Sequence, residues 1–138
     1  MSIGRPARFP ATLTRPRVAD ADTAWRMLSE LHKAEQEHFI VFDLDTRLRL
    51  IAKRVVFVGS LSGVEVHPRE VFRGAIQNGA AKIIIAHNHP SGDVTPSRMD
   101  FDLTARLKEV GTMVGIPILD HIVFAAGGYL SLSERGWL

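Results

Sequence analysis

The order of apolar segments along the chain constrains its fold more than any other feature of the sequence. Runs rich in β-forming residues cover 39–44, 48–52 and 55–58, and the polar stretch 43–47 can turn the chain between the first two. Further runs of this kind follow later in the chain, at residues 82–86, 116–119, 122–124 and 129–132. Closely spaced strands suit antiparallel pairing, so the sequence predicts an α/β domain whose mixed, mostly antiparallel sheet is flanked by helices.

Three segments with helical spacing are expected to pack on this sheet. The first covers residues 20–31 and has Asp20 or Asp22 as a possible N-cap. The second covers residues 68–79, where a proline suits the first turn and a glycine suits the end. The third begins near residue 98 and ends before a glycine at position 111. The side chains expected to face the core are Val71, Phe72, Ala75 and Ile76 in the second helix and Phe101, Leu103, Leu107 and Val110 in the third.

The chain of 138 residues contains no cysteine. This composition excludes disulfide bonds, thiolate catalysis and every zinc site that uses cysteine ligands. It also excludes the nucleobase deaminases, which bind zinc through a Pro-Cys-x-x-Cys motif. A metal ion bound by this chain must therefore be held by histidine, aspartate or glutamate.

Residues 1–17 carry a basic charge that the rest of the chain lacks. Arg5, Arg8, Arg15 and Arg17 precede the first acidic residue, whereas acidic residues slightly outnumber basic ones in the remainder. Prolines interrupt any regular element here, so we predict a flexible, solvated arm before a domain over residues 18–138. Contact of this arm with DNA phosphates is the alternative interpretation.

The hydropathy of the chain indicates no membrane segment. No apolar run approaches the roughly 20 residues needed to span a bilayer, and the N-terminus lacks the apolar region of a signal peptide. The expected location is therefore the cytoplasm, and no membrane partner is expected.

The segment from His87 to Asp100 has the residues of a metal site. His87 and His89 follow the apolar run 83–85, and residues two apart on an extended strand point the same way. Their imidazoles can reach one metal ion at about 2.0–2.1 Å, and Asp100 at the start of the next helix can supply a third ligand. Three protein ligands leave a fourth position for water, which is the arrangement of catalytic zinc sites in hydrolases.

Each part of this segment also has a purely structural interpretation. Histidines at a strand end are often polar groups that neighbouring hydrogen bonds satisfy. Ser97 and Asp100 have the spacing of a capping box at a helix N-terminus, although Glu or Gln is preferred at the second position. The spacing alone leaves both interpretations open.

The pattern H-x-H, seven residues, Ser, two residues, Asp resembles the JAMM motif of metalloproteases. His87, His89, Ser97 and Asp100 match it without a gap. From about residue 19 to the C-terminus the chain resembles the RadC branch of this family, and the segments that carry the resemblance are residues 43, 57–59, 66–72, 87–93, 96–97, 119–122 and 129–131. Longer RadC-like chains carry an N-terminal helix-hairpin-helix segment that this sequence lacks, which makes a DNA-repair function less expected.

The resemblance implies a cytidine-deaminase-like JAMM (MPN) fold and one zinc ion per chain, held by the two histidines and the aspartate of the motif. It also implies an upstream glutamate that acts as general base. In the RadC pattern this glutamate precedes an aromatic residue by two positions at a strand start, which fits Glu37, with Glu35 as the competing candidate. Ser97 would stabilise the oxyanion, and a peptide or isopeptide bond in a protein substrate would be hydrolysed.

Several further polar residues are expected to have structural roles. Asp120 and His121 could contact the ligands from behind, but satisfaction of the backbone at a strand edge is the preferred interpretation. His67 is expected at a helix start, and Asp93 is expected to be solvated. Asn88 is expected to point to the face opposite the two histidines.

The sequence therefore predicts a zinc-dependent metallohydrolase whose protein substrate and oligomeric state it does not identify. The main alternative is a DNA-associated repair or accessory module with little or no turnover, which the basic arm and the name of the RadC branch motivate. A metal-dependent nuclease is less expected. Two-metal phosphodiester chemistry usually needs more carboxylates than Asp93 and Asp102 provide near the site.

Overall fold

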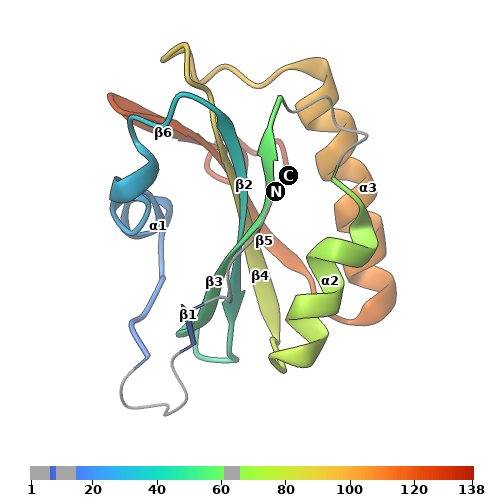
Figure 1. The fold of residues 1–138 in the computed structure, drawn as a ribbon. Coiled ribbons are helices and arrows are strands. Elements are labelled where there is room, and N and C mark those ends of the chain that lie inside the picture. Colours follow the sequence, from blue (N-terminus) through green and yellow to red (C-terminus); the bar gives the residue numbers. More distant parts are fainter. Residues whose placement is uncertain (1–6, 9–14, 61–65) are drawn as a thin grey trace.

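The computed structural model describes residues 7–8, 15–60 and 66–138, and these form a sheet with helices on both faces (Figure 1). The strands are β1 (Ala7–Arg8), β2 (Glu37–Leu44), β3 (Leu50–Gly59), β4 (Lys82–Asn88), β5 (Ile118–Ala125) and β6 (Gly128–Ser131). The helices are α1 (Ala21–Arg26), the 3-10 helix η2 (Ser29–Leu31), α2 (Pro68–Gln77) and α3 (Arg98–Val114). Within the described part, no helix has the length and hydropathy needed to cross a membrane.

The strands lie in the order β1-β3-β2-β4-β5-β6, and all neighbours pair antiparallel except β4 and β5. β2 and β3 form a hairpin in which Val41 pairs with Arg54. β4 and β5 run parallel because α3 carries the chain back along the sheet between them. The mixed, mostly antiparallel sheet flanked by helices is therefore confirmed.

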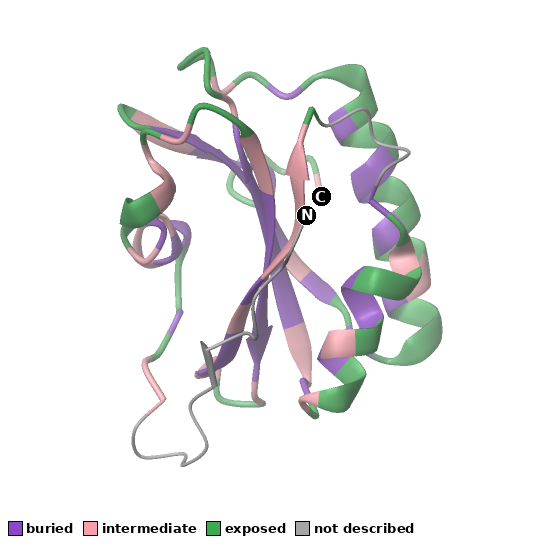
Figure 2. Cartoon of the chain, in the orientation of Figure 1, coloured by how far each residue is buried: buried purple, intermediate pink, exposed green. Residues whose placement is uncertain are grey.

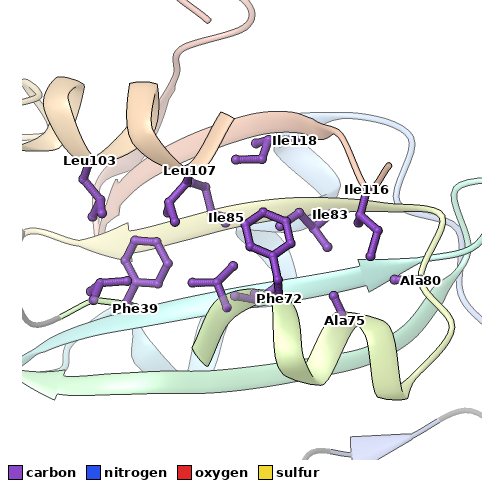
Figure 3. Close-up of a cluster of buried hydrophobic side chains, with 13 residues drawn as sticks. Phe39, Phe72, Ala75, Ala80, Ile83, Ile85, Leu103, Leu107, Ile116 and Ile118 are labelled. Atoms are coloured by element: carbon purple, nitrogen blue, oxygen red, sulfur yellow. The ribbon is translucent and has the colours of Figure 1, made fainter. Parts of the chain in front are cut away.

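β4 lies in the middle of the sheet and is buried on both faces (Figure 2). Ile83 and Ile85 pack with side chains of α2 and α3 in the cluster shown in Figure 3. Ile84 and Ala86 point the other way and pack with side chains of α1. The alternation continues to the end of the strand, so His87 points to the side of α3.

Two pairs of predicted strands are single strands. The runs on either side of Lys53 and Arg54 both belong to β3, and the runs on either side of Asp120 and His121 both belong to β5. Polar residues in an apolar pattern indicate a break, but here tertiary partners satisfy them. Arg54, for example, donates to the two carboxylate oxygens of Asp43 at 2.6 and 2.8 Å. The predicted meander is therefore a hairpin of two long strands.

The helices occur in the predicted order, but two predicted core residues are exposed. Asp20 caps α1 by accepting a hydrogen bond from Thr23 N at 2.8 Å, and α1 is shorter than predicted because a turn and η2 follow it. Ile76 is 59% exposed and borders a surface groove between α2 and α3. Phe101 is 38% exposed because it lies about 200° around the helix from Leu103, which faces the core.

α3 runs to Val114, although Gly111 was expected to end it. A Cβ at Gly111 would lie 2.7 Å from Ile116 O, so the glycine instead lets the chain pass close to the helix on its way to β5. Gly115 ends the helix in a left-handed conformation with φ of 77°.

Part of the predicted arm contacts the sheet. β1 pairs with β3, with Ala7 opposite Lys53, and Pro16 O accepts a hydrogen bond from Leu50 N at 2.7 Å. Arg15 pairs with Asp45 in the β2–β3 turn at 3.3 Å. Arg5 and the prolines at positions 6 and 10 lie outside the described residues. The domain boundary at residue 18 and the flexibility of residues 1–17 stay predictions.

Candidate metal centre

His87, His89 and Asp100 form a cluster on the α3 side of the sheet. His87 lies near the end of β4 and His89 directly follows the strand, so alternation directs both imidazoles to one face. The two Nε2 atoms are 3.0 Å apart. His87 Nε2 lies 3.1 Å from Asp100 Oδ1, and His89 Nε2 lies 3.3 Å from Asp100 Oδ2. One ligand atom from each residue lies within 4.8 Å of the others, which brings the three predicted ligands together around one position.

The loop between His89 and α3 returns Asp100 to the end of β4. Gly92 N donates to His89 O at 3.0 Å, and Gly92 adopts a φ of 92° that glycine tolerates without strain. Ser97 caps α3, because its Oγ accepts from Asp100 N at 3.1 Å while Asp100 Oδ2 accepts from Ser97 N at 2.7 Å. The capping interpretation is therefore confirmed, and it leaves Asp100 within the cluster.

Burial and mutual hydrogen bonding set the charge of the cluster. Burial raises the pKa of Asp100, but the hydrogen bonds with His87 and His89 outweigh it and hold the pKa below its usual range. The hydrogen bond with Asp100 in turn raises the pKa of His89, against the opposing effect of burial. The cluster thus combines one ionised carboxylate with two imidazoles, and a cation is its natural ligand.

The far side of the His89 ring fixes which nitrogen faces the cluster. His89 Nδ1 lies 2.7 Å from Asp93 O. A carbonyl oxygen only accepts, so Nδ1 carries a proton. The charged ring also donates from Nε2 to Asp100, and loss of this second proton leaves a neutral ring whose lone pair on Nε2 faces the cluster. Two imidazole nitrogens and a carboxylate with a fourth position left for water are the donors of a catalytic zinc site. The residues present therefore fit a zinc ion.

His121 and Thr104 contact the candidate ligands His87 and Asp100 on the side away from the cluster. His121 Nε2 lies 2.8 Å from His87 Nδ1, and His121 Nδ1 hydrogen-bonds with Thr104 Oγ1. Complete burial lowers the pKa of His121 well below its usual range. The preferred strand-edge interpretation is therefore wrong for His121. It is correct for Asp120, whose carboxylate accepts from the main-chain N–H groups of His121 and Ser133 and from the Ser131 hydroxyl at the end of β6. Sequence reasoning missed Thr104, although its position four residues after Asp100 puts both on one face of α3.

Glu37 begins β2 next to His89. The antiparallel β2–β4 pairing ends with Phe39 opposite His87. Glu37 lies two residues before Phe39 on the same face of β2, at the end of the sheet where His89 follows β4. After the hydrogen bond with Asp100, the negative charge of Glu37 is among the smaller causes that raise the pKa of His89. Glu37 is half-buried, whereas Glu35 precedes the strand and is exposed. Of the two candidate bases, Glu37 is therefore the one whose charge acts on a candidate ligand, His89.

Asn88 lies between the two histidines and points to the opposite face, as expected. Its side chain is buried, its Oδ1 accepts from His38 N at 2.6 Å, and its Nδ2 donates to Gln36 O at 3.0 Å. These two peptide groups flank Glu37. One amide side chain therefore fixes the backbone on both sides of the candidate base.

The other predicted polar residues lie where the sequence suggested. Ser97 is exposed at the start of α3, and a hydroxyl that accepts one hydrogen bond as a cap keeps its proton for donation. His67 is the N-cap residue of α2 and makes no side-chain capping bond. The side chain of Asp93 is exposed, but its main-chain carbonyl orients His89, a contact that side-chain reasoning does not reveal.

Known proteins resemble the chain over almost its whole length. A family model described as the RadC-like JAB domain matches residues 18–137. A UPF0758 protein of Shouchella clausii is 41% identical over 138 residues, which are 99% of this chain and 60% of that protein. A UPF0758 protein of Clostridium perfringens is 49% identical over 115 residues, and UPF0758 protein YsxA of Bacillus subtilis is 47% identical over 117 residues. These matches cover 83% and 85% of this chain but 51% of each relative, so the chain spans about half the length of these two relatives. The chain belongs to the RadC-like JAB domain family.

Proposed function

We propose that this chain is a zinc-dependent hydrolase, and more narrowly a metallopeptidase or isopeptidase. The observation that supports this most is the convergence of His87, His89 and Asp100, whose ligand atoms lie within 4.8 Å of one another at the end of the central strand. Membership of the RadC-like JAB family supports metal-dependent hydrolysis at this cluster. One zinc ion per chain would be held by these three residues.

The residues around the cluster have complementary chemical roles in the proposed reaction. A zinc ion at such a site supplies a Lewis acid and lowers the pKa of water to about 7. Glu37 accepts a proton from the attacking water and returns it to the leaving amine, a role that the effect of its charge on His89 supports. Ser97 donates its hydroxyl proton to the oxyanion while its oxygen caps α3. The net reaction adds water across the C–N bond and yields a carboxylate and an amine.

The proposed substrate is a peptide or protein in the cytoplasm. A single metal ion, one general base and one oxyanion donor are the groups that amide hydrolysis needs. Among the described residues, the metal cluster contains one carboxylate, which suits one metal ion better than the two-metal sites of nucleases.

Zinc content and peptidase activity in matched variants test this proposal. We expect the wild type to bind one zinc ion per chain and to generate new peptide ends in a proteome, read by mass spectrometry. Glu37→Gln should keep the zinc and lose about 10²–10⁴ of the rate, the range of general acid–base catalysis. Glu35→Gln is the matched control and should behave as wild type. His89→Ala should lose the zinc.

Three outcomes would contradict parts of this proposal. Full zinc stoichiometry in His89→Ala would exclude this residue as a ligand. Equal rates in the wild type and Glu37→Gln would exclude the general base, and a wild type that binds zinc but releases no peptide ends would exclude the peptidase function while leaving the metal site.

A DNA-associated accessory function is the second candidate, and the arginines within residues 1–17 are the observation that favours it. Arg17 is exposed, whereas Arg15 pairs with Asp45 at 3.3 Å. Phosphate contacts make the logarithm of affinity fall linearly with the logarithm of salt concentration. A gel-shift series over salt decides the question, because no binding of DNA at low salt would end this candidate.

A further inference from the structure

A chain of hydrogen bonds leads from His87 through β5 and back to the backbone of α3. We propose that Thr104 and His121 are positioning residues that hold the proton of His87 on Nδ1 and so present its Nε2 lone pair to the metal ion. The inference rests on the metal site of the proposed function, but it does not depend on which bond is hydrolysed.

The Thr104 hydroxyl sets the direction of the hydrogen bond between Thr104 and His121. Thr104 Oγ1 lies 2.7 Å from the main-chain carbonyl of Asp100, one helical turn earlier, and also contacts His121 Nδ1. The carbonyl oxygen can only accept, so the single hydroxyl proton is donated to it. The hydroxyl oxygen must then accept from His121. Nδ1 of His121 therefore carries a proton.

Burial decides the protonation of the other His121 nitrogen. His121 is 0% exposed, and its ring makes an edge-to-face contact with the Phe39 ring, with the ring centroids 6.1 Å apart. A charged imidazole in such surroundings is strongly disfavoured, so His121 is neutral and its Nε2 has a lone pair. The Thr104 hydroxyl thus makes His121 an acceptor on the side that faces His87.

The bond between the two histidines then fixes His87. His87 Nδ1 lies 2.8 Å from His121 Nε2. Two lone pairs cannot face each other at this distance, so His87 Nδ1 donates. His87 Nε2 lies 3.0 Å from His89 Nε2 and 3.1 Å from Asp100 Oδ1, distances at which a proton or a cation must lie between the atoms. A metal ion would take the place of that proton, and because Nδ1 keeps its own proton, the lone pair that reaches the metal ion is that of Nε2. Donation from the remote nitrogen also increases the basicity of a ligating histidine.

This series of hydrogen bonds also joins two of the proposed ligands that come from different elements. It begins at His87 in β4 and ends at the main-chain carbonyl of Asp100 in α3, with His121 of β5 between them. A displacement of α3 relative to the sheet would break the bond at Thr104 and release the orientation of His87. We therefore expect changes at Thr104 to affect metal affinity, although its side chain is not a ligand.

Three threonine variants separate this role from simple packing. Thr104→Val keeps the shape and removes the hydroxyl, so we expect the zinc dissociation constant, measured against a chromogenic chelator, to rise about 10–100-fold. Thr104→Ser keeps the hydroxyl and removes a methyl group, so its zinc dissociation constant should stay within about threefold of the wild-type value. This change is well below the loss of affinity typical when a hydrogen-bond partner of a ligating histidine is removed. Thr112→Val removes the same kind of bond to the carbonyl four residues earlier on the exposed face of α3, and should leave zinc affinity unchanged. A packing role predicts the reverse order for the two Thr104 variants.

Two variants of His121 test the second link. Gln can present a carbonyl oxygen to His87 Nδ1, whereas Phe fills the space without an acceptor. We expect His121→Gln to recover at least part of the zinc affinity that His121→Phe loses. Thermal unfolding of each variant without zinc confirms that the compared proteins are folded.

Nitrogen-detected NMR of the histidines gives a readout that does not require activity. We expect a proton on His87 Nδ1 in the zinc-loaded wild type, and a proton on His121 Nδ1 with or without zinc, since the Thr104 bond does not involve the metal. In Thr104→Val the His121 proton should redistribute toward Nε2. A wild-type His121 protonated on Nε2 alone, or a Thr104→Val protein with wild-type zinc affinity, would overturn the inference. Loss of peptidase activity with these readouts intact would instead overturn only the proposed reaction.

Discussion

The His87-Asn88-His89 triplet uses the two-residue period of a strand for two different tasks. The histidines point toward α3 and meet Asp100, whereas the amide of Asn88 points to the other face and holds the peptide groups on both sides of Glu37. One strand end therefore orients the candidate ligands and the candidate base together. A change at Asn88 can for this reason affect the base without removing a ligand.

We expect Asn88→Ala to lower the peptidase rate about 100-fold while zinc content stays at the wild-type level, since a misplaced catalytic group costs about this much. The amide makes the hydrogen bonds at 2.6 and 3.0 Å that fix the backbone around Glu37, and alanine makes neither. Steady-state kinetics and zinc analysis of the same preparation measure the two effects.

The double variant Glu37→Gln/Asn88→Ala is the control for this interpretation. If Asn88 acts through Glu37, the double variant should be no slower than Glu37→Gln alone, because the coupled effects are not additive. A further 100-fold loss in the double variant would show that Asn88 acts on something else.

At the level of single residues, the site was predictable where its signal is local. His87, His89 and Asp100 lie within one strand, one loop and one helix start, so spacing and strand alternation place them together. His121 and Thr104 contribute through tertiary contacts from β5 and the middle of α3. The Asp93 carbonyl contributes through the main chain. The spacing of Thr104 from Asp100 puts both on one face of α3, but no local pattern shows that His121 of β5 or the Asp93 carbonyl reaches the same cluster.

At the scale of the elements, one aspartate organises the turn between β2 and β3. Asp45 Oδ1 accepts from Arg47 N and Arg49 N, both at 2.9 Å, and Oδ2 pairs with Arg15. Burial raises the pKa of Asp45, but these hydrogen bonds and the charge of Arg15 together lower it by more than burial raises it. The pKa of Asp45 is therefore below its usual value. A lowered folded-state pKa stabilises the folded chain above the unfolded value of about 3.9, and this contribution is lost as the pH falls through the folded value.

We expect Asp45→Ala to lower the free energy of unfolding by about 1–3 kcal/mol at neutral pH, because it removes three partly exposed hydrogen bonds that each contribute about 0.5–1.5 kcal/mol. The difference from wild type should shrink as the pH falls below about 3.9, because the Asp45 carboxylate of the wild type is then progressively protonated and loses its charge. Urea unfolding at neutral and acidic pH measures both values. Glu109→Ala, on the exposed face of α3, should cost less than about 0.5 kcal/mol. A difference that persists unchanged in acid would contradict the role of the charge.

α2 lies close to β3 because residue 74 is glycine. A Cβ at Gly74 would lie 2.2 Å from Arg54 Nη1. The guanidinium cannot move aside without losing its bonds to Asp43 at 2.6 and 2.8 Å and to Val71 O at 2.8 Å. This ion pair is buried, with 8% of the Arg54 side chain and none of the Asp43 side chain exposed.

Gly74→Ala should therefore destabilise the protein, although alanine in a helix interior usually stabilises by about 1 kcal/mol relative to glycine. We expect a net loss of about 1–3 kcal/mol in the free energy of unfolding, the usual cost of overpacking. Gln77→Ala, exposed in the last turn of the same helix, should change stability by less than about 0.5 kcal/mol. Thermal unfolding of both variants gives the comparison, and a Gly74→Ala protein more stable than wild type would show that the ion pair can move.

At this scale the sequence predicted which elements form better than where they end. The apolar periodicity of the sequence is sufficient to predict α2 and β4, because these elements pack on their partners through one regular face of a helix and the two regular faces of a strand. β3 continues through Arg54 and β5 through Asp120 because the buried partners of these side chains come from other elements. Local sequence signals a break at both positions, and only tertiary pairing removes it.

At the scale of the whole molecule, the cluster of His87, His89 and Asp100 connects the sheet with α3, which a loop otherwise joins. Its residues come from the end of β4 and the start of α3, and the ring of His87 hydrogen-bonds with His121 of β5. In an unfolded chain these groups are not held together. Zinc should therefore bind the folded chain in preference to the unfolded one and stabilise the α3 layer on the sheet.

Zinc should accordingly raise the free energy of unfolding by about 2.7 kcal/mol when free zinc is 100-fold above its dissociation constant. Asp100→Asn keeps an oxygen that can accept from Ser97 N but loses the ligand charge, so the zinc-dependent shift in Tm should largely disappear while the helix cap remains. Asp102→Asn changes an exposed carboxylate two residues later and should keep the full shift. Thermal unfolding in buffered zinc, with a chelator added to reverse the effect, measures all three proteins. An undiminished shift in Asp100→Asn would mean that zinc stabilises the chain from another position, and the cluster would then no longer account for metal binding.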